Sequence, residues 1–168
     1  GEKIYFDPKL TELLNGKHPQ EKEYDEAGAI VARVLRSELL GKGKGYFIVD
    51  CDSGPSGDPS CTFTRDGEEK GTNISGLNFI LPCNGNIYAT GHINTMFNER
   101  KKYEWRAGQF VEVKQPYHYV GLDSTTNRAI QIYDSRQYKK SVASLPANSP
   151  VTVLINEDDD YLVKTPFG

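Results

Sequence analysis

Between Asp25 and Leu40 the apolar residues recur at the three- and four-residue spacing of a helix. Asp25 is a residue type that caps a helix start, and Gly41 stands where a left-handed residue commonly ends one. The spacing therefore predicts a helix over residues 25–40. Its apolar face would consist of Ala27, Ile30, Val31, Val34, Leu35 and Leu39.

From Gly45 onward the apolar positions change to a period of two, which is typical of half-buried strands. Asp66-Gly67 and Asn84-Gly85 supply the positive φ that tight hairpins require, so neighbouring strands are expected to pair antiparallel. Residues 45–115 should then form a meandering sheet with the helix on one face. The expected strands are 46–49, 61–64, 77–81, 86–90, 102–105 and 110–113. Ahead of them, residues 3–6 suggest a short strand and residues 8–15 a turn of helix.

A second β unit is expected after Gln115-Pro116, because proline interrupts a strand and biases the preceding residue toward extended geometry. The predicted domains are residues 1–115 and 116–168, and the predicted fold class is α+β, mostly antiparallel β. The strands expected in the second domain are 117–122, 129–133, 142–145, 151–155 and 161–164.

Four segments of the second unit resemble the bacterial SH3-like domain. They are Ala129-Ile130-Gln131-Ile132-Tyr133, Val142-Ala143-Ser144-Leu145-Pro146, Ser149-Pro150-Val151-Thr152-Val153-Leu154 and Asp160-Tyr161-Leu162-Val163-Lys164-Thr165. The Gly-Trp-Val type of closing strand that this family carries does not follow Phe167-Gly168. The resemblance implies a small SH3-like β-barrel and an exported binding or scaffolding module that contacts peptidoglycan or a neighbouring domain. Residues 45–115 also resemble part of uncharacterised secreted or lipid-anchored proteins of gut-type bacteria.

Charge and composition narrow the classes of partner. The 168 residues carry 20 Lys and Arg against 23 Asp and Glu, a net charge of -3, so no overall positive field favours nucleic acid. No segment has the roughly 20 apolar residues that cross a bilayer. Because Gly1 is not preceded by Met, we expect that an export signal has been removed. The protein would then be periplasmic or extracellular, and a lipid anchor is compatible with this location.

Three interpretations apply to the loop between Val49 and Cys61. Cys51 and Cys61 can form a disulfide in an oxidising compartment, with Cys83 as the spare thiol, whereas all three cysteines would be reduced in the cytosol. Alternatively, Cys51 resembles the nucleophile of papain-like cell-wall peptidases, with His92 as its base. The prolines and glycines after Cys51 disfavour the helix N-terminus that lowers a cysteine pKa in such enzymes.

The third interpretation of this loop is a cation site. Asp50, Asp52 and Asp58 can present several oxygens to Ca²⁺ on a turning loop. The spacing does not match an EF-hand, and Asp residues in a Gly/Pro loop usually accept hydrogen bonds from their own backbone. Beyond this Ca²⁺ alternative, no cofactor is expected.

Aromatic side chains are the remaining candidates for ligand contact, because Tyr and Trp combine a large apolar area with a polar tip. Packing in the core between the two halves of the chain is the favoured alternative for the same residues. The candidate ligand-binding residues are Tyr103, Trp105, Tyr117, Tyr119 and Tyr133. Acidic residues 157–160 are interpreted as a solvated hairpin tip. The sequence thus predicts a non-catalytic binding module of the bacterial cell envelope, whose partner is a cell-wall glycan or peptide or an envelope protein.

Overall fold

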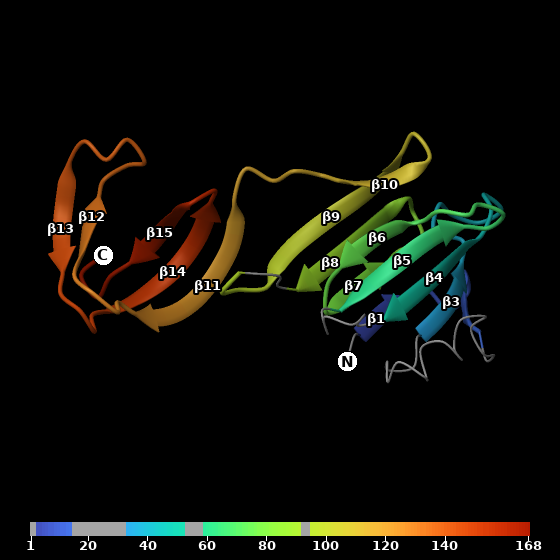
Figure 1. Ribbon diagram of the computed structural model, residues 1–168, viewed down its shortest axis with the longest axis horizontal. Helices are drawn as coiled ribbons and strands as arrows, with labels where there is room; N and C mark the ends of the chain where they lie inside the picture. The colour runs from blue at the N-terminus through green and yellow to red at the C-terminus, as the bar shows by residue number, and fades with distance from the viewer. Residues whose placement is uncertain (1–2, 15–32, 53–58, 92–94) are drawn as a thin grey trace. The chain divides into compact units, whose positions relative to one another are not determined.

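The computed structural model describes residues 3–14, 33–52, 59–91 and 95–168. Throughout these residues the regular elements are strands, β1 to β15, with no helix among them (Figure 1). The described chain is therefore all-β, and the predicted α+β class is wrong. The chain divides into two compact units, Gly1–Lys114 and Gln115–Gly168.

Unit 1 consists of two five-stranded sheets, one ordered β2-β3-β4-β5-β6 and the other β1-β7-β8-β9-β10. The strands of the first sheet are β2 (Thr11–Leu13), β3 (Arg33–Ser37), β4 (Phe47–Asp52), β5 (Ser60–Arg65) and β6 (Thr72–Ser75). Those of the second are β1 (Lys3–Phe6), β7 (Asn78–Leu81), β8 (Asn86–Gly91), β9 (Glu99–Arg106) and β10 (Gln109–Glu112). The pairings are antiparallel apart from β1, which lies parallel to β7.

Alternate side chains of both sheets meet in one hydrophobic core. The ring of Phe63 on β5 lies 6.0 Å from that of Phe79 on β7 and 5.9 Å from that of Phe110 on β10, centroid to centroid. These contacts join residues of opposite sheets, so the two sheets pack face to face as a sandwich. The buried core residues are Leu35, Leu39, Phe47, Val49, Cys51, Cys61, Phe63, Ile74, Phe79, Leu81, Ile87, Ala89 and Phe110.

The predicted helix over residues 25–40 is wrong where the structure describes it. Arg33–Ser37 is strand β3, paired antiparallel with β2 and β4, while residues 25–32 lie outside the described residues. Leu35 and Leu39 are buried in the core. A spacing of four residues suits both a helix and a strand, because four is close to 3.6 and is also twice two. Of the predicted helical turn at residues 8–15, residues 8–10 form a turn and Thr11–Leu13 is strand β2, while Asn15 lies outside the described residues.

The period-two segments did predict strands. All six segments expected between residues 45 and 115 overlap β4, β5, β7, β8, β9 or β10, and the segment at residues 3–6 is β1. Cys83 and Gly85 adopt φ of 56° and 84° in the turn between β7 and β8. The antiparallel pairing predicted from Asn84-Gly85 is confirmed, although Cys83 and Gly85, and not Asn84, adopt positive φ.

Unit 2 contains a three-stranded sheet, β11-β14-β15, and a separate β12-β13 hairpin (Figure 1, orange to red). The strands are β11 (His118–Thr125), β12 (Ile130–Tyr133), β13 (Ser141–Leu145), β14 (Pro150–Glu157) and β15 (Asp160–Lys164). The described strands of unit 2 do not close into a barrel, so the closed SH3-like barrel expected from the sequence is not formed. Strands β12 and β13 pair only with each other, and neither pairs with a strand of the β11-β14-β15 sheet.

Two residues, Thr126 and Arg136, form hydrogen bonds between different segments of unit 2. Thr126, after β11, donates its hydroxyl to the Pro146 carbonyl at 2.7 Å and its backbone N–H to the Ser149 carbonyl at 3.0 Å. Arg136, in the β12-β13 loop, donates to Asp160 and Asp158 at 2.9 and 3.0 Å. The acidic tip that was interpreted as solvated therefore binds an arginine of the hairpin.

Candidate functional site

Two of the aromatic candidates, Tyr103 and Trp105 on β9, are half-buried and pack against the core of unit 1. The Trp105 ring meets the rings of Phe47 and Phe110 edge-on, at centroid distances of 5.1 and 5.0 Å. The Tyr103 hydroxyl donates to Glu112 Oε2 at 3.5 Å. These contacts give Tyr103 and Trp105 a role in stabilising the sandwich.

The other three candidates, Tyr117, Tyr119 and Tyr133, lie exposed in unit 2. Tyr119 belongs to β11 and Tyr117 precedes that strand, whereas Tyr133 ends β12. The Tyr133 ring meets the Tyr138 ring edge-on at 5.2 Å within the hairpin region. Tyr103 and Trp105 thus belong to one strand of unit 1 and pack against its core, whereas Tyr117, Tyr119 and Tyr133 are exposed residues of unit 2.

Strand pairing surrounds Tyr119 with further apolar side chains. Tyr119 of β11 lies opposite Ile155 of β14, and Ile155 lies opposite Leu162 of β15. Directly opposed residues share a face of the sheet. Tyr119 and Leu162 are 58% and 57% exposed, so this apolar row faces solvent. We call these three residues the Tyr119 row.

A β-bulge determines where the Tyr119 ring lies. The β11-β14 register shifts between Tyr119 and Leu122, and Gly121 adopts a φ of +64° within the bulge. A Cβ on Gly121 would come within 2.5 Å of the Tyr119 hydroxyl oxygen. The ring therefore lies against the Gly121 backbone, and a larger residue would displace it. The lack of a side chain at Gly121 leaves the space that the Tyr119 ring occupies.

Opposite charges stand on the strands to either side of β14, next to the Tyr119 row. Asp123 and Lys164 both pair with Thr152 on the central strand. The Thr152 hydroxyl donates to Asp123 Oδ1 at 2.7 Å. This part of the sheet consequently offers apolar contact together with one acidic and one basic side chain, a composition suited to binding.

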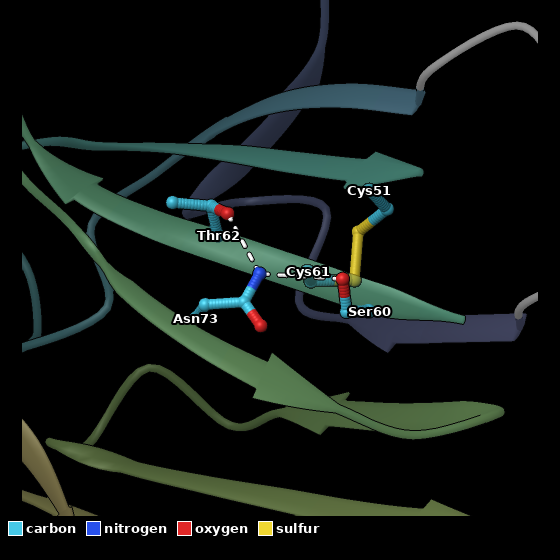
Figure 2. Close-up of a disulfide and its surroundings, with 5 residues drawn as sticks. All are labelled: Cys51, Ser60, Cys61, Thr62 and Asn73. Carbon is cyan, nitrogen blue, oxygen red and sulfur yellow. Dashed lines mark hydrogen bonds between the residues drawn. A yellow bond between two sulfur atoms is a disulfide. The ribbon is translucent and has the colours of Figure 1, made fainter. Parts of the chain in front are cut away.

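The Cys51 and Cys61 sulfurs are joined at 2.00 Å. The two residues are directly opposite in the β4-β5 pair and are buried in the core (Figure 2). On the other face of β5, Asn73 of β6 donates to the hydroxyls of Ser60 and Thr62 at 3.2 and 3.0 Å (Figure 2). The disulfide joins β4 to β5, and the Asn73 side chain joins β6 to β5 by hydrogen bonds.

The cysteine-peptidase hypothesis places its nucleophile at a disulfide sulfur. A sulfur bonded to another sulfur is not the thiolate that attacks a carbonyl, so Cys51 cannot serve as nucleophile while this bond is intact. His92, the expected base, lies outside the described residues. Cys83 is the free cysteine among those described, and its buried thiol lies 3.5 Å from Ser37 Oγ.

The candidate Ca²⁺ ligands are only partly described. Asp50 and Asp52 belong to β4, and Asp58 lies outside the described residues. Within the described ranges, no group of three His, Cys, Asp or Glu side chains is arranged to hold a metal ion.

Ile155 and Leu162 were not among the candidates, although their strands were predicted. A period-two pattern does not reveal which residues of neighbouring strands lie opposite each other, and the bulges in both ladders of β14 shift that register. One signal was available in Tyr161-Leu162-Val163, where three consecutive nonpolar residues require at least one to face away from the interior.

No family model matches the sequence, and neither the curated proteins nor the solved structures include a match to it. Within the described residues, no helix has the length and apolar character needed to cross a membrane.

Proposed function

We propose that this protein is a non-catalytic binding module of the bacterial cell envelope, which contacts a cell-wall glycan or peptide, or an envelope protein, through the Tyr119 row. The observation that carries the proposal is the adjacency of three apolar side chains on an open sheet face, two of them more than half exposed. Contiguous exposed apolar surface of this kind is typical of interaction sites. A rigid tyrosine at its edge adds a hydrogen-bonding tip.

The envelope location is supported by the Cys51–Cys61 disulfide, because such bonds form and persist in exported proteins and are rare in the cytosol. The resemblance of residues 117–168 to the bacterial SH3-like domain points to the same location. The disulfide also favours binding over the cysteine-peptidase alternative, since it occupies the sulfur that the enzyme would need.

Co-sedimentation of the full chain with purified peptidoglycan sacculi tests this function. The wild-type protein should sediment with the sacculi, and both Tyr119→Ala and Leu162→Ala should weaken binding by roughly tenfold, as removal of a central contact residue commonly does. Tyr161→Ala is the matched control, because Tyr161 is also exposed on β15 but pairs with Asn156 in the adjacent, opposite-facing position.

Two results would contradict the proposal. One is that the wild-type protein binds neither sacculi nor total envelope protein, and stays in the supernatant in both assays. The other is release of soluble wall fragments that iodoacetamide abolishes, which would indicate a reactive cysteine and hydrolysis. Circular dichroism of each variant shows whether the fold is retained.

A further inference from the structure

A second apolar row lies on the outer face of the β1-β7-β8-β9-β10 sheet of unit 1. Tyr5 of β1 lies opposite Ile80 of β7, and Ile80 lies opposite Tyr88 of β8. Their sequence neighbours Ile4, Phe79 and Ala89 pack in or against the core, so the row points away from it. We call Tyr5, Ile80 and Tyr88 the Tyr5 row.

The Tyr5 row forms an exposed aromatic platform. Tyr5, Ile80 and Tyr88 are 56%, 50% and 39% exposed. The two tyrosines stand on strands separated by β7, which places their backbones two strand spacings apart, ~9.5 Å. Two rings spaced in this way on one sheet face suit an extended polymer of rings better than a single small ligand.

Cationic side chains line one end and one flank of the Tyr5 row. Lys102 of β9 continues the row beyond Tyr88. Lys3 and Arg100 stand at the two ends of the adjacent outward row, and both are exposed. Glu104, which the pairing with Asn86 places on the same face, forms an ion pair with Arg106. Lys3 and Lys102 therefore give this face positive charge on a chain whose net charge is -3.

Neutral hydrogen-bonding groups fill the space between these charges. Asn78 and Thr90 lie opposite each other between Lys3 and Arg100. Asn86 flanks Tyr88 on the other side, two residues away on the same strand. Amides and hydroxyls beside aromatic rings provide donors and acceptors for a hydroxyl-rich ligand.

We propose that the Tyr5 row and its flanking cations bind an acidic polysaccharide, a chain of sugar rings that bear carboxylates. The apolar faces of the rings would stack on Tyr5 and Tyr88, and the carboxylates would pair with Lys3 and Lys102. The positive charge of this face is the observation that favours an anionic polymer over a neutral one. The inference rests on the proposed envelope location but concerns side chains of unit 1 instead of the Tyr119 row.

Single-stranded nucleic acid is the other anionic polymer that stacks on tyrosines. The Cys51–Cys61 disulfide favours the glycan, because the compartments in which disulfides persist expose a protein to wall and capsule polymers.

Affinity electrophoresis of the full chain in gels containing polygalacturonate tests the inference. Migration of the wild-type protein should be retarded, and retardation should fall as salt is added because carboxylate–ammonium contacts are screened. Tyr5→Ala combined with Tyr88→Ala should weaken binding at least roughly tenfold, since stacked aromatic residues dominate such interfaces. Lys3→Gln combined with Lys102→Gln should weaken it and reduce its salt dependence.

The matched control is Tyr119→Ala, which should leave polygalacturonate binding unchanged while it weakens sedimentation with sacculi. That contrast separates failure of this inference from failure of the proposed function. Equal retardation by a neutral galactan, tighter binding of an oligo-dT strand through the same tyrosines, or self-association that the double tyrosine variant abolishes would each overturn the proposal. Unchanged retardation of the double tyrosine variant would overturn it as well.

Discussion

At the residue scale, Tyr103 lies between the core of unit 1 and its charged rim. Burial is the main cause that raises the pKa of Tyr103 above its ordinary value of 10.0, and the negative charge of Glu112 raises it further. Lys101 lies nearby, with its ammonium 2.7 Å from Glu99 and 3.9 Å from Glu112. The folded state therefore favours the neutral phenol.

This pKa shift predicts that stability is lost at alkaline pH. Because the folded-state pKa is raised, the stabilisation is fully present below about pH 10 and disappears as pH rises through the folded-state value. Tyr103→Phe should make the free energy of unfolding of unit 1 less dependent on pH above about pH 10. Urea unfolding followed from about pH 8 to pH 11 measures the difference.

Tyr46, whose pKa is raised by a different main cause, serves as the comparison for this alkaline effect. Its hydroxyl is hydrogen-bonded to Glu38, which raises the pKa of Tyr46, so Tyr46→Phe tests a tyrosine outside the core. If Tyr103→Phe and the wild-type protein lose stability in parallel over the alkaline range, burial of the Tyr103 phenol does not account for the loss.

At the element scale, the β4-β5 hairpin is held by its disulfide as well as by its ladder. Cys51 and Cys61 are ten residues apart in sequence. A crosslink that closes a loop of this length stabilises a fold by about 2–3 kcal/mol, mainly by restricting the unfolded chain. Joint replacement, Cys51→Ala with Cys61→Ala, should lower the free energy of unfolding of unit 1 by about that amount.

Reductant distinguishes this effect from ordinary loss of core packing. The free energy of unfolding of the wild-type protein, measured with denaturant, should fall when dithiothreitol is added. That of the double alanine variant should not change with dithiothreitol. Cys83→Ser is the matched control and should keep the response, because Cys83 is the free cysteine of the described chain. The prediction would be contradicted if dithiothreitol left the free energy of unfolding of the wild-type protein unchanged.

The same scale explains why β3 was mistaken for a helix. Leu35 and Leu39 are buried at positions four apart, and period-two and period-3.6 patterns coincide at that spacing. Pairing of β3 with β4, which places Leu35 opposite Val49, outweighed the helical preference of the local sequence. The six segments with clear alternation between Gly45 and Val113 had no such ambiguity and overlap strands, whereas β6 (Thr72–Ser75) was not predicted.

At the scale of the whole molecule, each unit has internal contacts of its own. In unit 2, one arginine connects the β12-β13 loop to the β14-β15 turn. Arg136 pairs with Glu157, Asp158 and Asp160, and these partners raise its pKa. The contact is exposed, so we expect salt to weaken it.

Arg136→Gln should loosen the hairpin of unit 2 without affecting unit 1. Amide hydrogen exchange should become faster in β12 and β13, while amides of core residues such as Phe63 and Phe79 keep their protection. Arg128→Gln, a change at an exposed arginine of the same unit, is the matched control and should leave exchange unchanged. Faster exchange in unit 1, or an unchanged exchange rate in β12 and β13, would contradict this account of the Arg136 contact.

The sequence by itself determined where most strands lie, because the alternation of apolar and polar side chains is a local property that one strand displays without its neighbours. It also identified Cys51 and Cys61 as partners in one of several interpretations. Only the tertiary structure decided that β3 is a strand, that Tyr103 and Trp105 face the core, and that Tyr119 and Tyr5 stand in exposed rows. The physical reason is that register, bulges and sheet order depend on pairing between distant segments, which no short window of sequence contains.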